Sequence, residues 1–309
     1  MPLEKYLTKI KIEGSTALTL GVFDGVHIGH QHLLSQLIRQ AKEESLSSIV
    51  ITFTSHPKTV LGCQNQVLMI TTVEDRLRLL KEQGTNLVLP LPFDQDIAQL
   101  SAEEFIDQVK KLLKMRVLVL GPNAVIGRNC GGDSNTLRSL SNKMDFEFVT
   151  IPPVKIDSEM VSSSRIRQAL IKGDIRYANK MLGRFFSISG PVIKNRGLGR
   201  TFGLPTANIK YDPSLVLPAN GVYASLTHLK GQTYSSITNI GERPTFKLEG
   251  RTVEVHIFNF QEEIYSEMLK IDIIERIREE RKFPNTDMLY EQISRDIIQA
   301  KEIINRISD

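Results

Sequence analysis

The first half of the chain alternates regularly between two kinds of segment, and this alternation is the strongest constraint on the fold. From residue 17 onward, short runs rich in β-branched and large apolar residues alternate with runs in which apolar residues recur at helical spacing. The predicted strands are residues 17–23, 47–53, 86–93, 116–121 and 146–152. Such alternation is typical of a parallel sheet covered by helices, so we expect an α/β domain here.

The helical runs between these strands each carry one apolar face. In residues 32–41 the predicted face consists of Leu33, Leu34, Leu37, Ile38 and Ala41, and in residues 72–84 it consists of Leu77, Leu79 and Leu80. A third helix is predicted to begin at Ser101, because Glu104 follows at the spacing of a capping box, and to continue through residues 105–114. All three helices are therefore suited to pack on a sheet.

The second half of the chain has a different texture, which begins near residues 182–187. Glycine, proline and asparagine turns there separate short strands predicted at residues 187–193, 221–229, 232–241 and 252–260. This pattern indicates an antiparallel barrel or a sandwich. A final helix is expected from Thr286 to Arg306, with an apolar face of Leu289, Ile293, Ile297 and Ile298. Two domains are therefore predicted, residues 1–183 and residues 184–309.

Composition narrows the class of protein. The chain has 309 residues, enough to bury two cores, and its two cysteines, Cys63 and Cys130, lack the spacing of a zinc site or a disulfide framework. The charged N-terminal stretch has no apolar signal region, and no segment reaches the ~18 apolar residues of a membrane span. We therefore expect a cytoplasmic protein without membrane contact. The net charge of +4 suits phosphate-bearing small molecules and does not require nucleic acid.

The stretch GVFDGVHIGHQHLL, residues 21–34, contains the first candidate site. Gly21 is expected at the carboxyl end of the first strand, where open α/β sheets bind ligands. His27 and His30 are three positions apart at a helix start and so share a face, while Gly29 lets a phosphate approach the backbone. Two imidazoles there are placed to donate hydrogen bonds to a phosphate. The alternative is that the histidines are only a helix cap and a surface residue.

A second anion-binding signal lies in VSSSRIRQAL, residues 161–170. The serines Ser162 to Ser164 can cap a helix, and Arg165 and Arg167 project from its first turn. Serine-capped helices with arginines are common, so this segment alone is a weak signal. Its combination with the strand, the H-x-G-H turn and the following helix is much more specific.

These two segments resemble the nucleotidyltransferase superfamily, in which G-x-F-D-G-x-H-x-G-H and S-S-x-R-I-R flank the triphosphate of ATP. More narrowly, FDGVHIGHQ, ITFTSHP and GPNAVIGR resemble the adenylyltransferase half of the bacterial bifunctional riboflavin kinase and FAD synthetase family. The resemblance implies a Rossmann-like nucleotidyltransferase domain with His27 and His30 as catalytic residues. It implies that the residues binding ATP or its phosphates are Gly21, Phe23, Asp24, Gly25, Gly29, Ser163, Ser164 and Arg167.

Two flavin contacts, His56 and Asn123, are also implied in this half. His56 precedes a proline, and the alternative is an ordinary turn histidine. Around Asn123 the chain departs from the family, which usually shows G-x-N/D-F-x-F-G, because Ala124 and Ile126 stand where the family has phenylalanines. If this segment contacts the isoalloxazine ring, we expect weaker stacking there.

In the second half, the segment GLGRTFGLPTAN, residues 197–208, is the densest motif. It is not a Walker A loop, because no G-K-[S/T] follows, but its glycines permit a loop that closes on a phosphate. Thr206 and Asn208 are two residues apart, so in an extended segment both point to the same side and can present oxygens to Mg²⁺ or phosphate. The alternative is a plain turn that leads into a strand.

This segment closely resembles the loop and P-T-A-N motif of riboflavin kinases. The resemblance implies an antiparallel β-barrel kinase domain with a C-terminal helix. It implies ATP or phosphate contacts from Gly199, Arg200, Gly203, Pro205, Thr206 and Asn208. It further implies Mg²⁺ binding by Thr206 and Asn208, a flavin or nucleotide contact from Arg278, and Glu254 as the base that activates the ribityl hydroxyl. Asn259 and Ser266 depart from the family, which commonly has aspartate and glycine there.

The sequence therefore predicts an enzyme that uses ATP and Mg²⁺ to convert riboflavin to FMN in the second domain and FMN to FAD in the first. One rival is a chain with only one active half, such as a riboflavin kinase whose other domain binds flavin poorly. Another is a flavin-binding or RNA-binding module without turnover, although an aromatic content of 6% and the lack of a basic stripe disfavour RNA. The predicted partners are small-molecule substrates, with no nucleic acid and no membrane; an oligomer is possible but no assembly signature indicates it.

Overall fold

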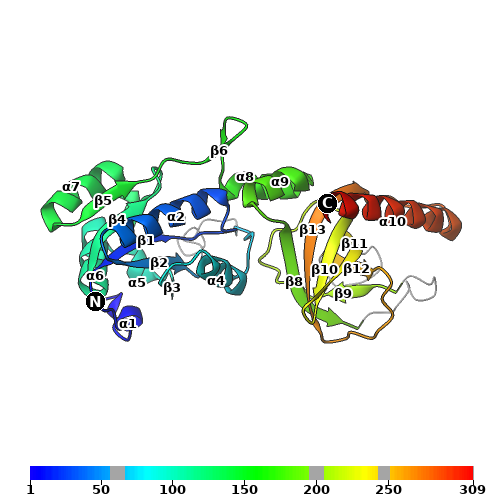
Figure 1. The fold of residues 1–309 in the computed structure, drawn as a ribbon, viewed down its shortest axis with the longest axis horizontal. Helices are drawn as coiled ribbons and strands as arrows, with labels where there is room; N and C mark the ends of the chain where they lie inside the picture. Colours follow the sequence, from blue (N-terminus) through cyan, green and yellow to red (C-terminus); the bar gives the residue numbers. More distant parts are fainter. Residues whose placement is uncertain (56–66, 195–204, 243–250, 309) are drawn as a thin grey trace. The chain divides into compact units, whose positions relative to one another are not determined.

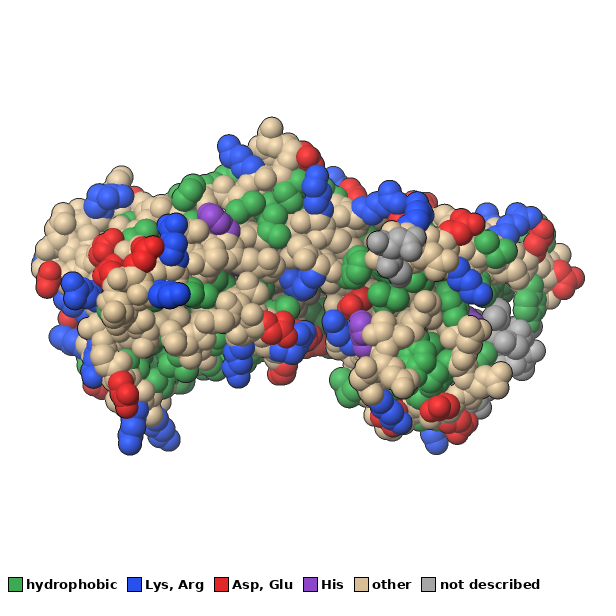
Figure 2. All heavy atoms as spheres, in the orientation of Figure 1, with side chains coloured by type: hydrophobic (Ala, Val, Ile, Leu, Met, Phe, Trp, Pro, Cys, Tyr) green, Lys and Arg blue, Asp and Glu red, His purple; other side chains and the backbone are tan. Residues whose placement is uncertain are grey.

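The structure is a computed structural model of the chain that describes residues 1–55, 67–194, 205–242 and 251–308. These residues form two compact units, Met1–Ser163 and Ser164–Asp309, each of which is described by itself. Figure 1 shows the helices and strands of both units, and Figure 2 shows positive and negative side chains interspersed on the visible face of each. None of the described helices is both long enough and apolar enough to cross a bilayer.

A five-stranded parallel sheet in the order β3-β2-β1-β4-β5 forms the centre of the first unit (Figure 1). Its strands are β1 (Thr16–Gly21), β2 (Ser47–Phe53), β3 (Leu87–Leu91), β4 (Met115–Leu120) and β5 (Glu147–Thr150). The predicted parallel sheet is confirmed. The first strand is shorter than predicted, because the backbone turns left-handed at Phe23, where φ is 53°.

Helices cover the two faces of this sheet. They are α1 (Glu4–Leu7), α2 (Ile28–Glu43), α4 (Val73–Glu82), α5 (Gln95–Ala98), α6 (Ala102–Leu113) and α7 (Ser134–Met144), together with the 3-10 turn η1 (Arg128–Cys130). Alternate residues of the strands join different apolar clusters: Leu18 and Ile51 pack with residues of α6 and α7, whereas Ala17 and Val50 pack with residues of α2 and α4. The capping box of Ser101 and Glu104 on α6 is confirmed.

The strand order places a topological switch point beside β1. The chain passes from β1 to β2 and β3 on one side, then crosses back to β4 on the other side. Ligands of open α/β sheets bind outside the carboxyl ends of the strands at such a point. Gly21 ends β1 and Gly121 follows β4, so both candidate segments of the first unit begin at this edge.

The second unit contains a closed antiparallel barrel, which decides between the predicted barrel and sandwich. Its strand order is β10-β11-β12-β9-β8-β13, and β10 pairs with β13 to close it. The strands are β8 (Phe186–Ile193), β9 (Ala207–Ile209), β10 (Gly221–Leu229), β11 (Gln232–Glu242), β12 (Arg251–Ile257) and β13 (Met268–Glu279). The closing strand β13 was not among the strands predicted above, and neither was the small hairpin of β6 (Lys155–Ile156) and β7 (Glu159–Met160) in the first unit.

Three helices accompany the barrel, namely α8 (Ser163–Lys172), α9 (Ile175–Leu182) and α10 (Thr286–Ser308). The final helix is confirmed, but its predicted apolar face is partly wrong. Ile298 is 60% exposed, whereas Ala300, Ile303 and Ile304 are buried in a cluster with barrel residues and Ile297 packs against it. The buried face is therefore rotated away from Ile298.

Candidate active sites

A tight turn connects β1 to α2 at the carboxyl edge of the parallel sheet. The N–H of Val26 donates to the carbonyl of Phe23 over 3.0 Å, and Gly25 takes a φ of 80°. A Cβ at Gly25 would lie 3.1 Å from the side chain of Ile70. Glycine is therefore required at this position both by the backbone conformation and by the neighbouring segment.

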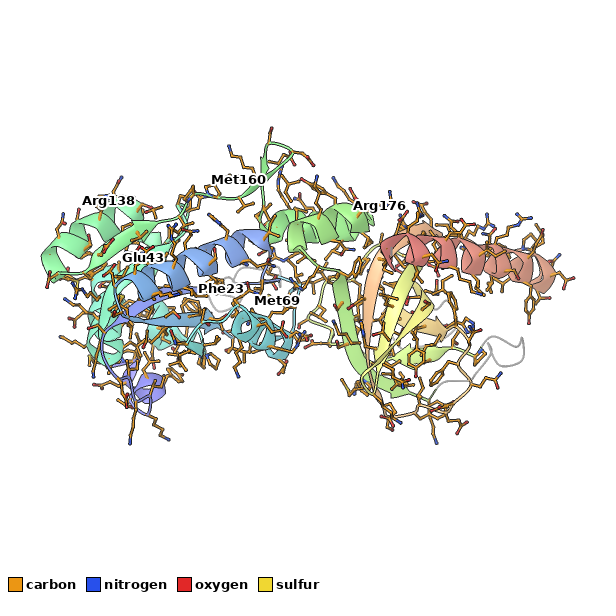
Figure 3. All side chains as sticks on the ribbon, in the orientation of Figure 1. Phe23, Glu43, Met69, Arg138, Met160 and Arg176 are labelled. Carbon is orange, nitrogen blue, oxygen red and sulfur yellow. The ribbon has the colours of Figure 1, made fainter. Side chains whose placement is uncertain are left out.

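Asp24 fixes this turn to the segment that precedes α4. Its buried carboxylate accepts hydrogen bonds from the N–H groups of Ile70 at 2.9 Å and Thr71 at 3.2 Å. Figure 3 marks the two joined segments by the labels of Phe23 and Met69. These contacts hold the loop of the candidate phosphate site, and the predicted contact of Asp24 with ATP stays a prediction.

His27 and His30 lie against each other at the N-terminus of α2. His27 is the N-cap residue, and its Nδ1 accepts from the backbone N–H of His30 at 3.3 Å. The rings stack with centroids 3.6 Å apart and 15° between their planes, and His27 is 5% exposed. Because Nδ1 accepts, a neutral His27 carries its proton on Nε2. The cap therefore leaves one ring nitrogen as a donor.

Gly29 provides the space for this arrangement. A Cβ at residue 29 would lie 3.2 Å from both Cε1 and Nδ1 of His27. That separation is shorter than an ordinary van der Waals contact, so any side chain would press on the imidazole that caps the helix. The glycine of the H-x-G-H motif thus leaves room for the His27 imidazole to cap the helix.

The serine and arginine segment reaches the same turn through Ser163. The hydroxyl of Ser163 donates to the carbonyl of Asp24 over 2.9 Å, which joins residues 139 positions apart in the sequence. Ser164 and Arg167 follow on α8, which groups with the second compact unit. Their predicted phosphate contacts stay predictions.

The atypical segment after β4 differs from what its missing aromatics suggested. Ile126 is 4% exposed and belongs to the core of the first unit, and Ala124 packs against the same core. An aromatic ring at position 126 would therefore occupy the core, not a ligand surface. Asn123 is exposed beyond β4, and its flavin contact stays a prediction. His56, the other predicted flavin contact, lies outside the described residues.

Arg76 on α4 is a buried charge near this edge that the motifs did not reveal. It is 0% exposed, and its Nη2 donates to the carbonyl of Phe53, the last residue of β2, over 2.9 Å. Its Nε and Nη1 atoms make no hydrogen bond with any part of the chain that the structure describes. Burial lowers the pKa of this guanidinium, while the nearby carboxylate of Asp24 opposes that shift. The sequence held one signal for the burial of Arg76. It precedes Leu79 by three residues and Leu80 by four, so it lies on the apolar face of α4.

In the barrel, three polar residues lie side by side on neighbouring strands. Glu254 on β12 is directly opposite Asn208 on β9 and directly opposite Asn239 on β11. Residues directly opposite in antiparallel strands point to the same face, with Cβ atoms about 4.5–5.5 Å apart. The structure therefore brings together two of the predicted residues, Glu254 and Asn208, and adds Asn239 beside them.

The P-T-A-N segment enters the barrel at β9. Pro205 and Thr206 precede the strand and are exposed, Asn208 lies within it and is 6% exposed, and the ring of His256 contacts the carbonyl of Pro205 at 2.9 Å from Nδ1. The predicted loop residues Gly199, Arg200 and Gly203 lie outside the described residues.

A cavity of about 450 Å³ opens next to this segment. Its lining residues include Pro205, Thr206, Val192, Val255 and Tyr265. Glu254 does not line it, because Val255 and Glu254 are adjacent on β12 and point to opposite faces. The cavity and the candidate base are thus on two sides of the same strand, with the P-T-A-N segment bordering both.

Arg278 at the end of β13 contacts the final helix. Its Nε donates to Asp296 of α10 over 2.8 Å, and its guanidinium lies over the ring of Phe283, 5.6 Å from the centroid. The arginine therefore ties the end of β13 to the final helix. Its predicted contact with flavin or nucleotide stays a prediction.

Comparison with known proteins gives matches over both halves. A family model described as FAD synthetase matches residues 9–165, and one described as riboflavin kinase matches residues 182–304. A bifunctional riboflavin kinase/FMN adenylyltransferase of Bacillus subtilis (strain 168) is 35% identical, covering 93% of this chain and 92% of the relative. The protein of that name from Haemophilus influenzae is 35% identical with 94% of each chain covered. A crystal structure described as a macrolide-efflux protein from Streptococcus pneumoniae superposes with a TM-score of 0.88 at 31% identity, covering 96% of this chain and 97% of that one.

Proposed function

Because the chain belongs to the family of bifunctional riboflavin kinase/FMN adenylyltransferases, we propose that the two groups of residues described above are its two active sites. The chain phosphorylates riboflavin to FMN with ATP and then adenylylates FMN to FAD with release of pyrophosphate. The observation that best supports the placement of the kinase site is the strand register that sets Glu254 opposite Asn208.

In the barrel, Glu254 acts as the general base of the kinase reaction. A ribityl hydroxyl of riboflavin attacks the γ-phosphorus of ATP, the bond from that phosphorus to the bridging oxygen breaks, and ADP leaves. The carboxylate of Glu254 takes the hydroxyl proton. The cavity beside Thr206 suits a planar ring of one of the two substrates, since Val192, Val255 and Tyr265 offer it apolar contact.

The residues around the P-T-A-N segment also fit Mg²⁺. Thr206 offers a hydroxyl and Asn208 an amide oxygen, which are the hard ligands that this ion prefers. Mg²⁺ is usually bound by few protein oxygens together with phosphate oxygens of the substrate, and a hydroxyl and an amide oxygen suit that role. When bound, the ion neutralises charge on the phosphates. Thr206 and Asn208 would hold the ion through these two oxygens.

In the first unit, His27 and His30 stabilise charge during adenylylation. A phosphate oxygen of FMN attacks the α-phosphorus of ATP, the bond to the β-phosphate oxygen breaks, and pyrophosphate leaves. The Nε2–H of His27, together with His30 and the backbone at the start of α2, donates to the phosphates. No covalent enzyme intermediate is needed, since binding brings the two reacting phosphates together.

We infer a cytoplasmic location and small-molecule partners only. ATP is a cosubstrate of both steps, and the spacing of the two cysteines does not call for an oxidising compartment. The net charge of +4 suits phosphate-bearing small molecules and does not require a nucleic acid, and blue and red side chains are mixed on the face that Figure 2 shows.

Separation of flavins by chromatography tests this proposal. The purified chain is incubated with Mg²⁺ and ATP, in one tube with riboflavin and in another with FMN. We expect FMN and FAD in the first tube and FAD in the second. FMN alone in the first tube, with no FAD in either, would leave only the kinase half of the proposal standing.

Two sets of variants assign the halves. Replacing both histidines (H27A with H30A) should abolish FAD formation from FMN and leave riboflavin phosphorylation intact. Glu254→Gln, which keeps the size of the side chain, should do the reverse. Unchanged rates in a folded variant would reject the role of the residue replaced.

A further inference from the structure

We propose that His256 is a positioning residue of the riboflavin kinase site, which fixes the Pro205–Thr206 segment by donating a hydrogen bond to the carbonyl of Pro205. This inference rests on the proposed kinase function of the barrel. It assigns a role to a side chain that neither binds substrate nor takes a proton from it.

The hydrogen bond has a defined direction. Nδ1 of His256 lies 2.9 Å from the oxygen of Pro205, and a carbonyl oxygen can only accept. Nδ1 therefore carries a hydrogen, a condition met by one neutral tautomer and by the imidazolium alike. Proline has no backbone N–H, so its carbonyl is the only backbone group through which this residue can be held by a hydrogen bond.

The position of His256 explains why a side chain is needed here. The ladder between β12 and β9 pairs Val253 with Ile209, Glu254 with Asn208 and Val255 with Ala207, and it ends there. Beyond Ala207 the chain leaves the strand, so backbone pairing no longer restrains Thr206 and Pro205. The imidazole of the next β12 residue continues the restraint past the end of the ladder.

The ring of His256 is itself supported from the other side. It lies against the ring of Phe258, with centroids 5.8 Å apart and 57° between the planes. Phe258 is buried in the cluster that contains Ile303 and Ile304 of α10. The His256 ring is therefore restrained by two contacts, the ring of buried Phe258 and the carbonyl of Pro205.

Thr206 follows Pro205 directly and is the candidate oxygen ligand for Mg²⁺ with ATP. It also borders the cavity beside the segment. Loss of the hydrogen bond should let this segment leave its binding geometry, which weakens ATP binding more than it slows the chemical step. We expect the KM for ATP in riboflavin phosphorylation to rise about tenfold, with kcat reduced less than threefold.

Two amide variants separate a hydrogen-bonding role from a packing role. In His256→Asn the amide nitrogen occupies the place of Nδ1 and can still donate to Pro205, whereas in His256→Gln, which is closer in size to histidine, it occupies the place of Nε2. We expect H256N to keep a KM for ATP within about threefold of the parent, and H256Q and H256A to show the tenfold rise, which corresponds to about 1.4 kcal/mol.

His228 offers a matched control on the same barrel. It also makes side-chain hydrogen bonds, to Thr233 at 2.9 Å and to Asp272 at 2.8 Å. Thr233 is four positions along β11 from Ile237, the residue opposite His256, which is about 13 Å of extended strand. H228N should leave the KM for ATP unchanged.

Urea unfolding of each full-length variant reports whether the barrel remains folded, and FAD formation from FMN, which the first unit carries out, serves as the internal reference for the amount of active protein. Equal KM values for H256N and H256Q, or a KM for H256A equal to that of the parent, would overturn the positioning role. A parent protein that makes FAD from FMN but no FMN from riboflavin would instead overturn the proposed kinase function, so the two failures are distinguishable.

Discussion

The imidazole of His27 uses its two nitrogens for different partners. Nδ1 accepts from the N–H of His30 and caps α2, so in the neutral ring Nε2 carries the hydrogen and is the donor that we propose for a phosphate. The helix cap and the candidate catalytic contact, which the sequence presented as alternatives, are therefore compatible in one side chain. The two imidazole rings also stack, with centroids 3.6 Å apart, so each ring restrains the orientation of the other.

Asparagine at residue 27 would separate these two roles. Its side-chain oxygen can accept from the N–H of residue 30, so His27→Asn should keep the free energy of unfolding within about 0.5 kcal/mol, whereas H27A should lose about 1 kcal/mol with the cap. Both variants remove the Nε2 donor and should form FAD from FMN about 100-fold or more slowly. Urea unfolding and the rate of FAD formation measure the two effects, with riboflavin phosphorylation as reference. Full FAD formation by H27N would reduce His27 to a helix cap.

The role of a residue could be predicted from the sequence where it depends on the backbone of one turn. It could not be predicted where it depends on packing against distant segments. Gly29 and His27 act within one helix turn, so their motif was informative. Ile126 looked like a lost ligand contact, and the structure adds that it is a core residue, buried in a cluster that strands and helices of the first unit build together. Ser266 replaces a common glycine and takes a φ of 65°, but its N–H still donates to Val192 at 2.9 Å, so the turn is kept.

At the level of elements, two packing arrangements were not revealed by the apolar patterns of the sequence. The buried face of α10 includes Asp296, whose carboxylate accepts from Arg278 at 2.8 Å and Gln292 at 2.7 Å. A prediction from apolar residues alone leaves out the buried Asp296 and wrongly includes the exposed Ile298. In β13, Ile273 and Ile274 are both buried, the second in the cluster with residues of α10, so the strand lacks the alternation that marks a half-exposed strand.

A charge cluster also attaches the short helix α1 to α5. Asp94 accepts from Lys5 at 2.9 Å and from Tyr6 at 2.7 Å, and it caps α5 by accepting from Ile97 at 2.9 Å. Although partial burial acts to raise it, the hydrogen bonds from Lys5, Ile97 and Tyr6 hold the pKa of Asp94 down at about 2. A lowered pKa means that the ionised carboxylate stabilises the folded state.

Asp94→Asn tests this attachment, because asparagine keeps the helix cap and removes the charge. We expect a loss of about 0.5–1 kcal/mol at pH 7, the range of a solvent-screened ion pair. The stabilisation is complete above the ordinary pKa of about 3.8 and disappears as the pH falls toward 2. Urea midpoints of parent and variant should therefore differ equally at pH 7 and pH 5, and the difference should shrink below about pH 4 and be nearly gone at pH 2. D107N, which removes an exposed pair with Lys111, is the control; a difference between parent and D94N that persists at pH 2 would contradict the charge mechanism.

At the level of the whole molecule, residues 164–183 are assigned differently by the sequence and by the structure. The sequence places them in the first domain, with a boundary near residue 183, and the structure groups α8 and α9 with the barrel as one compact unit. The N–H of Ala219 donates to Leu170 of α8 over 2.9 Å, and Arg176 of α9, labelled in Figure 3, pairs with Glu275 at 2.6 Å. The predicted domain bounds, residues 1–183 and 184–309, stay a prediction, which the stability of fragments can test.

Asn179 joins α9 to two barrel strands at once. Its Nδ2 donates to the carbonyl of Ile273 on β13 over 2.9 Å, and its Oδ1 accepts from the N–H of Phe186 on β8 at 2.7 Å. Replacing it would leave buried backbone groups without partners, at a cost of about 1–3 kcal/mol for each. Asn179 is therefore a sensitive probe of whether α9 stabilises the barrel.

Two fragments decide where the folding unit begins. We expect residues 164–309 to unfold at a higher urea concentration than residues 184–309, because only the longer fragment retains α8, α9 and the contacts of Asn179. N179A should lower the midpoint of the longer fragment toward that of the shorter one. Riboflavin phosphorylation by each fragment reports whether the barrel is intact. Equal midpoints for the two fragments, together with no effect of N179A, would mean that α8 and α9 add nothing to the stability of the barrel. The boundary would then lie near residue 183, with α8 and α9 in the adenylyltransferase domain.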